Sequence, residues 1–216
     1  MNNNETLTRD IETIDIEAAM QEINEEVVSV PARQTKTIEY HFRQIMLALG
    51  LDLNDDSLKN TPLRVAKMYV NEAFSGLNPA NEPAVTLFKN KYNYGEIVLE
   101  KDIPVYSYCE HHFVPIIGKA HIAYVPDGKV AGLSKLNRAV RYFSKRPQVQ
   151  ERLTLEIANF LIEKLHTGHV AVVIEAEHLC ISSRGIKDIG STTITGSYHG
   201  CFETERKGEL LQLLNK

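Results

Sequence analysis

The sequence has few cysteines, no long apolar run and no excess of positive charge. Its three cysteines are an odd number and do not suggest the disulfide framework of a secreted domain. No apolar run reaches the length of a membrane-spanning helix. The polar segment Met1–Asp10 lacks the apolar core of a signal peptide. We therefore expect a cytoplasmic protein, whose thiols stay reduced and available to a metal ion.

Charge and length restrict the class of protein further. The net charge is −4 and the isoelectric point is near 6.1, which argues against general binding to nucleic acid or to a membrane surface but permits a local basic pocket. With 216 residues, 43% of them apolar, the chain is long enough for one large domain, or for a domain with an extension.

A Cys-x-x-His motif with a distant cysteine is the most informative pattern. Cys109 and His112, together with Cys180, offer two thiolates and one imidazole to one ion. This set suits zinc, and three protein ligands leave a fourth position open, as in catalytic sites. The ordinary alternative is a buried apolar cysteine and a structural histidine. His111 and His178, which lie beside the two halves of the motif, favour the metal site.

The order of predicted elements indicates an α+β fold with an antiparallel sheet. Residues 1–35 are expected to form an extension, either a docking helix or a flexible tail, with apolar residues at helical spacing: Ile16, Met20, Ile23 and Val27. Helices are predicted at 37–49, 61–74, 134–143, 147–165 and 203–214. Strands are predicted at 97–99, 103–106, 116–117, 120–125, 169–176 and 191–197. Each half of the metal motif falls in the connection between two strands.

Two basic segments are candidates for binding an anion. Ser134, Lys135 and Arg138 lie at a predicted helix start, where backbone N–H groups and cations favour a phosphate. The alternative is a solvated helix face. Arg184 follows Cys180 by four residues, so its guanidinium is expected near the metal and suits a phosphate. The alternative for Arg184 is a surface salt bridge.

Glu151 lies in the first turn of the helix that Pro147 is expected to open. A glutamate there is favourable with the helix dipole. It could equally accept two hydrogen bonds from a ligand, and the spacing does not choose between these roles.

The chain resembles GTP cyclohydrolase I over roughly residues 38 to 214. The resemblance rests on several motifs in the right order: Thr61-Pro62 with Arg64-Val65-Ala66, Cys109-Glu110-His111-His112, Gly132-Leu133-Ser134-Lys135, the segment from Arg146 to Thr154, and His178-Leu179-Cys180 with Arg184-Gly185. It implies a catalytic domain at 36–216 and the tunnelling fold, in which an antiparallel sheet carries two helices on one face. It also implies a homodecamer of two five-membered rings, with active sites at subunit interfaces.

The resemblance also implies roles for individual residues. Zinc would be held by Cys109, His112 and Cys180, and protons would be transferred by His111 and His178. The guanine of GTP would be held by Gln150 and Glu151, and its triphosphate by Ser134, Lys135, Arg138 and Arg184. The implied reaction opens the imidazole ring of GTP to give 7,8-dihydroneopterin triphosphate and formate, the first step of tetrahydrofolate and pterin biosynthesis. Cys201 matches no metal position of the family.

Three alternatives compete with this interpretation. A zinc-stabilised binding module would need a fourth protein ligand, which His111 or His178 would have to supply. A zinc nucleobase deaminase would carry a His-x-Glu and Pro-Cys-x-x-Cys pattern, which is missing. Related tunnelling-fold enzymes that act on another pterin or deazapurine lack the full set of two cysteines and paired histidines.

Overall fold

The computed structural model describes residues 29–215. Contacts divide the chain into two compact units, with the boundary between Lys67 and Met68. The predicted helix at Ile16 to Val27 lies outside the described residues, and so does most of the predicted extension. No helix within 29–215 combines the length and the apolar character that crossing a membrane requires.

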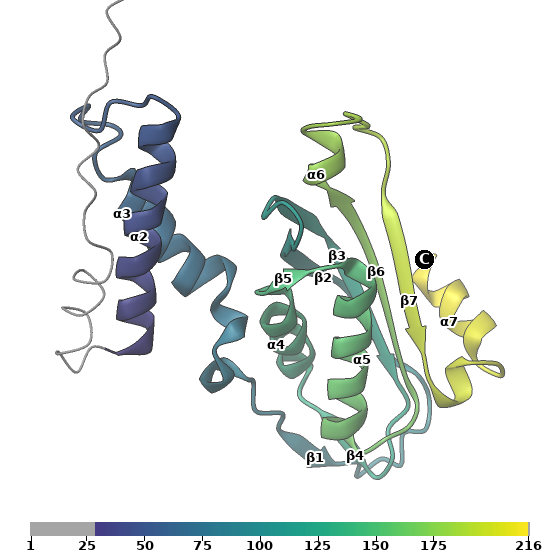
Figure 1. Cartoon of the computed structure of the whole chain (residues 1–216). Helices are drawn as coiled ribbons and strands as arrows, with labels where there is room; N and C mark the ends of the chain where they lie inside the picture. Colours follow the sequence, from purple (N-terminus) through teal and green to yellow (C-terminus); the bar gives the residue numbers. More distant parts are fainter. Residues whose placement is uncertain (1–28, 216) are drawn as a thin grey trace, which may run out of the picture. The chain divides into compact units, whose positions relative to one another are not determined.

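In its described part, from residue 29 onward, the first unit is helical, as predicted. Helix α2 spans Val30–Ala48 and α3 begins at Thr61 with Pro62 next, spanning Thr61–Met68 (Figure 1). Gly50 has φ +75°, the left-handed conformation that ends helices and favours glycine. The predicted boundary between residues 35 and 36 falls inside α2.

The second unit is built on a five-stranded sheet in the order β5-β2-β3-β6-β7. Its three inner strands are β2 (Val98–Cys109), β3 (Pro115–Tyr124) and β6 (Val170–His178), each antiparallel to its neighbour (Figure 1). The outer strands are β5 (Pro147–Gln148), parallel to β2, and β7 (Thr193–Tyr198), antiparallel to β6. The predicted hairpins are therefore confirmed, with the metal motif in the connections that join their strands.

Shorter elements complete this unit. A π-helical turn η1 (Tyr69–Ala73) continues α3, and two 3-10 turns follow it, η2 (Ser75–Leu77) and η3 (Pro79–Asn81). Strands β1 (Leu87–Lys89) and β4 (Lys129–Ala131) form a separate antiparallel pair. The remaining elements are α6 (Leu179–Ser182), the 3-10 turn η4 (Gly200–Phe202) and α7 (Lys207–Leu214).

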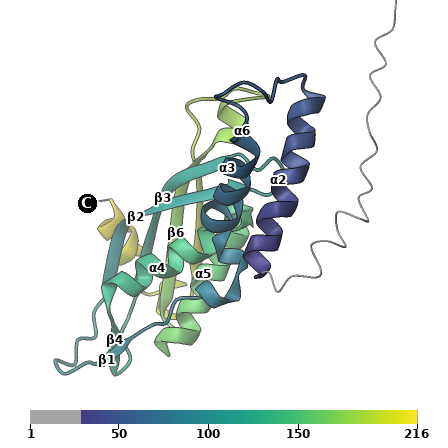
Figure 2. The ribbon, with the colours of Figure 1, turned by 90° about the vertical axis from the view of Figure 1, so that its left-hand side faces the viewer.

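Two helices cover one face of the sheet and form the main core with it. Helix α4 spans Leu133–Ser144 and α5 spans Gln150–Leu165, and both lie across the same face (Figure 2). Their fully buried residues include Leu136, Leu153 and Leu161. At about 25 cal/mol per Å² of apolar surface removed from water, this core is the main source of stability.

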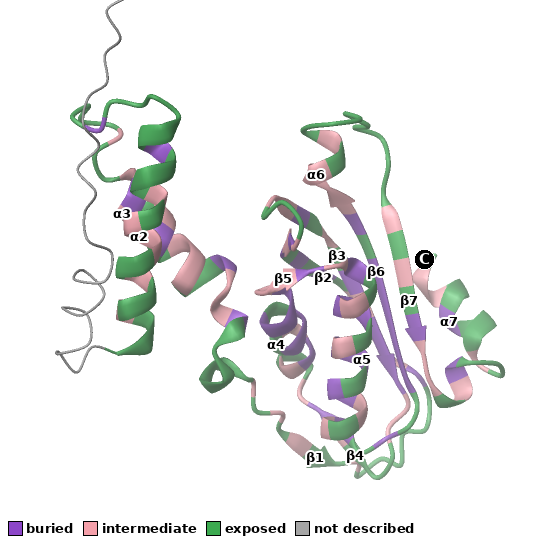
Figure 3. Cartoon of the chain, in the orientation of Figure 1, coloured by how far each residue is buried: buried purple, intermediate pink, exposed green. Residues whose placement is uncertain are grey.

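The C-terminal segment covers part of the opposite face. Alternate residues of a strand point to opposite faces, so Ile122 joins the helix-facing core while Ala123 packs with Phe202 and Leu210 of the C-terminal segment. Strand β6 is consequently buried on both faces from Val170 to Ile174 (Figure 3). This explains why its sequence is continuously apolar rather than alternating.

One predicted helix start was wrong. Pro147 was expected to open the helix that contains Glu151, but Pro147–Gln148 forms strand β5 beside Tyr108 and Cys109, and α5 begins at Gln150. Proline is tolerated in a strand at the edge of a sheet, where its missing N–H is not needed. The carbonyl of Gln148 accepts a hydrogen bond from the N–H of Glu110 at 3.0 Å, which ties β5 to the metal motif.

We predict that Gly118→Ala destabilises the sheet. A Cβ at Gly118 would lie 2.1 Å from the carbonyl oxygen of Glu175 and 2.5 Å from Cα of Ala176, so two paired strands would have to separate. Such overpacking costs about 1–3 kcal/mol of unfolding free energy. Thermal unfolding followed by circular dichroism should show a clearly lower midpoint.

Gly208→Ala is the matched control. Gly208 lies in α7, and no atom lies within 4 Å of the position that an added methyl group would take. Alanine should therefore leave the unfolding midpoint unchanged or raise it slightly. Equal midpoints for Gly118→Ala and the unsubstituted protein would contradict the close approach.

Candidate metal centre and catalytic site

Sheet topology brings the two halves of the metal motif together. Strands β2 and β6 are both antiparallel to β3, so they run parallel to each other and their C-terminal ends meet at one edge. Cys109 is the last residue of β2, and Cys180 follows β6 in the short helix α6. The register places Tyr108 opposite Pro115 and His178 opposite Ile116, so the two cysteines flank the start of β3.

The ligand atoms of Cys109, His112 and Cys180 all lie within 4.8 Å of one another. Cys109 Sγ is 3.9 Å from His112 Nδ1. Around one tetrahedral ion with bonds of about 2.0–2.3 Å, ligand atoms lie roughly 3.6–3.8 Å apart. The three side chains therefore fit a single ion with little movement, as the spacing predicts.

Burial and charge around these ligands favour a bound cation. Cys109 is buried, Cys180 is half-buried and His112 is exposed, so the centre is open to solvent on one side. Burial raises the pKa of the Cys180 thiol, and the adjacent Cys109 raises it further. Two neighbouring thiolates repel each other, and a divalent cation relieves that repulsion because thiolate is the ligating form.

The turn that carries His111 and His112 is held from several sides. Phe113 has φ +53°, in the left-handed region, and its ring packs 5.0 Å from that of Phe74. The Glu110 carboxylate accepts a hydrogen bond from Arg152 at 2.5 Å. Sequence reasoning missed this pair, because no spacing signal links residues of two separate motifs.

The two histidines beside the ligands have different surroundings. His111 is exposed, and its Nδ1 lies 3.6 Å from Cys109 Sγ. His178 is half-buried, and its Nε2 lies 2.7 Å from Oε1 of Gln150. Burial lowers the pKa of His178, whereas the charge of Glu151 acts in the opposite direction. Both rings lie at the metal edge, by which we mean the edge of the sheet where Cys109, His112 and Cys180 cluster.

Gln150 and Glu151 are adjacent in sequence but differ in accessibility. The side chain of Glu151 is exposed in the first turn of α5, where it can meet a ligand. Gln150 is only 1% exposed, and its amide is hydrogen-bonded within the protein. No sequence pattern indicates this difference, because the partners of Gln150 include Thr193 and Thr195 of the distant strand β7.

Arg184 and the first turn of α4, which carries Ser134 and Lys135, lie at different ends of the sheet. The charge of Arg184 lowers the pKa of Cys180, in keeping with a place near the metal centre. Asn137 of α4 instead donates a hydrogen bond to Glu100 near the start of β2. At 3.3 Å per residue, the strand from Glu100 to Cys109 spans roughly 30 Å. Ser134 and Lys135, one turn before Asn137, are therefore not brought to the metal centre of the same chain.

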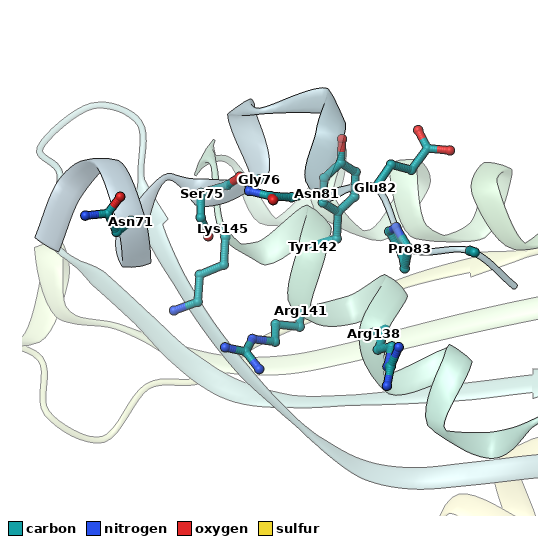
Figure 4. A pocket seen from close by; sticks show the side chains of 11 residues that line it. Asn71, Ser75, Gly76, Asn81, Glu82, Pro83, Arg138, Arg141, Tyr142 and Lys145 are labelled. Carbon is teal, nitrogen blue, oxygen red and sulfur yellow. Dashed lines mark hydrogen bonds between the residues drawn. The ribbon is translucent and has the colours of Figure 1, made fainter. Parts of the chain in front are cut away.

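Arg138 lines a basic hollow of about 480 Å³ (Figure 4). Arg141 and Lys145 line it too, since positions spaced by three and four residues share a helix face. Burial lowers the pKa of Lys145, and the charge of Arg141 lowers it further. Within residues 29–215, no carboxylate lies at salt-bridge distance from these three cations. Glu82 also lines the hollow, but three cations against one carboxylate leave it suited to an anionic group such as phosphate.

Comparison with known proteins gives consistent matches over most of the chain. Residues 38–215 match the family described as GTP cyclohydrolase I. A relative named GTP cyclohydrolase 1 from Flavobacterium johnsoniae is 54% identical over 178 residues, covering 82% of this chain and 80% of the relative. Proteins of the same name from Vibrio cholerae and Aeromonas hydrophila are 51% and 53% identical, and the matches cover 82% and 80% of this chain and 82% and 79% of those proteins.

We predict that Cys180→Ser loses the metal while the fold survives. Serine is a much poorer ligand than thiolate, and Cys180 packs only against the margin of the main core, where serine is nearly the same size. Metal content per chain, measured by mass spectrometry after dialysis, should fall severalfold, while the far-ultraviolet circular dichroism should be retained.

Cys201→Ser is the control, because Cys201 packs with the C-terminal segment and is absent from the ligand cluster. It should retain the metal content of the unsubstituted protein. Full metal content in Cys180→Ser, or an equal loss in Cys201→Ser, would contradict the ligand assignment.

Proposed function

The chain belongs to the GTP cyclohydrolase I family, and from this membership we propose that it converts GTP to 7,8-dihydroneopterin triphosphate and formate. The observation that carries the proposal is the cluster of Cys109, His112 and Cys180 at one edge of the sheet, beside two histidines and an exposed glutamate. This reaction would be the first step of tetrahydrofolate and pterin biosynthesis. We place it in the cytoplasm, where thiols stay reduced.

The metal is proposed to be zinc. Two thiolates and an imidazole are ligands that zinc accepts in tetrahedral sites, and three protein ligands leave a position open. When bound, zinc supplies Lewis-acid chemistry by lowering the pKa of water toward about 7. The open side of the centre at His112 supports access for a substrate rather than a closed structural site.

His111 and His178 are proposed to transfer protons during the reaction. Carbon 8 of guanine is a poor electrophile, and a proton donated to nitrogen 7 makes it a better one. One water adds to carbon 8 as the ring opens, and a second water releases formate. The freed ribose then rearranges, and a new ring closes with loss of one water to give the product. Histidine suits these transfers because its ordinary pKa lies near 6.5. Both rings are at the metal edge.

Glu151 is proposed to select guanine. Nitrogen 1 and the exocyclic amine of guanine are adjacent donors, and a carboxylate accepts from both. Adenine presents an acceptor at nitrogen 1, so lone pairs would face each other. A site that hydrogen-bonds its substrate in this way can reject the wrong base by ~10⁴-fold or more.

We propose that the triphosphate is bound between subunits. Ser134, Lys135 and Arg138 would hold it with Arg184, yet the α4 residues lie roughly 30 Å from Cys109 along β2. A neighbouring copy can supply them, in a tunnelling-fold decamer of two pentameric rings. The exposed Tyr106 and Ile117, on the face of the sheet opposite α4 and α5, support such contacts between copies.

The activity is tested directly by incubating the purified protein with GTP. After oxidation, we expect neopterin fluorescence together with one formate for each GTP consumed. The metal-poor Cys180→Ser protein should be inactive, and Cys201→Ser should be active. A metal-loaded protein that releases neither product would contradict the proposed reaction.

We predict that Glu151→Gln lowers turnover of GTP at least tenfold with normal metal content. The change replaces one acceptor by a donor, and loss of a charged two-pronged contact costs on the order of 2–4 kcal/mol. Glu163→Gln is the control, since Glu163 is an exposed residue of the same helix. Near-normal kinetics in Glu151→Gln, with a slightly lower melting temperature, would contradict a role in guanine binding. Glu151 would then only stabilise α5 through the helix dipole.

Sharing of sites between copies predicts complementation. Arg138→Ala and Cys180→Ser should each be inactive alone, but co-expressed chains should regain activity at about a quarter of their sites if two copies form each site. Cys109→Ser with Cys180→Ser is the control pair, since both changes damage the same end and cannot complement. No recovery in the first pair, despite mixed assemblies, would contradict shared sites.

A further inference from the structure

Gln150 is a buried polar residue whose side chain is hydrogen-bonded to the ring of His178. It is the first residue of α5 and is 1% exposed. A buried amide that lacks partners costs about 1–3 kcal/mol, so its hydrogen bonds determine how it is oriented. All of its polar atoms have partners within the described structure.

The orientation of the Gln150 amide follows from its neighbours. Nε2 donates to the carbonyls of Ile174 at 3.0 Å and Thr193 at 2.9 Å. Backbone carbonyls only accept hydrogen bonds. A flipped amide would set Oε1 against two carbonyl oxygens, which is strongly unfavourable. The NH₂ group must therefore face β6 and β7, and Oε1 must face His178.

Two threonines are compatible with this orientation of the amide. The Thr154 hydroxyl lies 2.8 Å from the carbonyl of Gln150, so its proton points there. Thr195 Oγ1 lies 2.6 Å from Thr154 Oγ1 and can donate its own proton to it. Thr195 Oγ1 is then left as an acceptor, and Gln150 Nε2 lies 3.1 Å away.

The orientation of the Gln150 amide determines which ring nitrogen of His178 carries a proton. Its Nε2 lies 2.7 Å from Gln150 Oε1, an atom that only accepts. Nε2 must therefore carry a proton, and in the neutral ring the lone pair is on Nδ1. We propose that Gln150 is a positioning residue that holds His178 in the Nε2–H tautomer, so that this ring exchanges protons with the substrate through Nδ1.

This inference builds on the proposed function, and it changes the expectation for Gln150. The sequence resemblance assigns Gln150 to guanine, but its side-chain amide is occupied by Ile174, Thr193, Thr195 and His178. Guanine recognition by a side chain of this pair is then left to Glu151. Gln150 therefore affects the reaction indirectly, by orienting the imidazole ring of His178.

The tautomer can be measured without turnover. In protein labelled with ¹⁵N-histidine, magic-angle-spinning NMR distinguishes a protonated from an unprotonated ring nitrogen, and comparison with His178→Gln assigns the signals. We expect a protonated Nε2 and an unprotonated Nδ1 for His178 in the metal-loaded protein. A ring protonated at Nδ1 alone would overturn the proposal, whether or not GTP is consumed.

Kinetics separate positioning from substrate binding. Gln150→Met keeps the length but removes the amide, and we expect kcat to fall by about 10–100-fold, with KM for GTP within about twofold. A rise in KM with unchanged kcat would instead assign Gln150 to guanine and overturn the positioning role.

Thr167→Val controls for loss of a buried hydrogen bond. Thr167 is 5% exposed and donates to the carbonyl of Val125, away from His178. Its variant should lose stability but keep kcat. If Gln150→Met behaves in the same way, the amide is only structural and the proposal fails. Absence of GTP turnover in the unsubstituted protein would count against the proposed function and leave the NMR result to decide the tautomer.

Discussion

Strand β3 is the element on which the site depends. It pairs with β2 along one side and with β6 along the other, both antiparallel. Two strands that share an antiparallel neighbour must point the same way, so their ends meet. This constraint brings Cys109 and Cys180 to one edge although they are far apart in the sequence. The close approach at Gly118, which admits no side chain, keeps β3 and β6 in that register.

At the metal edge, some residues are exposed to solvent and others are buried. His112, His111 and Glu151 are exposed, whereas Cys109 and Gln150 are enclosed by the sheet and α5. Exposed groups can meet a substrate, and enclosed groups keep fixed geometry because each has a defined set of neighbours. The link from Arg152 to Glu110 adds a further brace to the turn between β2 and β3.

Much of this organisation is predictable from sequence because it is local or periodic. The helix at Thr61-Pro62, the hairpins and the Cys-x-x-His turn carry strong short-range signals, and the structure confirms them. The helix start predicted at Pro147 was wrong, because a proline suits an edge strand as well as the first turn of a helix. The partners of Gln150 were not predictable, because Thr193 and Thr195 reach it only through sheet pairing. The roughly 30 Å between Ser134 and the metal edge likewise depends on the direction of α4.

The hydrogen bonds from Gln150 to β7 have a consequence for exchanging segments between relatives. Helix α5 contributes Gln150 and Thr154, while β7 contributes Thr193 and Thr195, and the four residues are joined by hydrogen bonds. A foreign α5 that alters one of its two members would leave a buried donor or acceptor in β7 without its counterpart. Helix α5 and strand β7 must therefore be exchanged together, and a functional chimera must take both segments from the same parent protein.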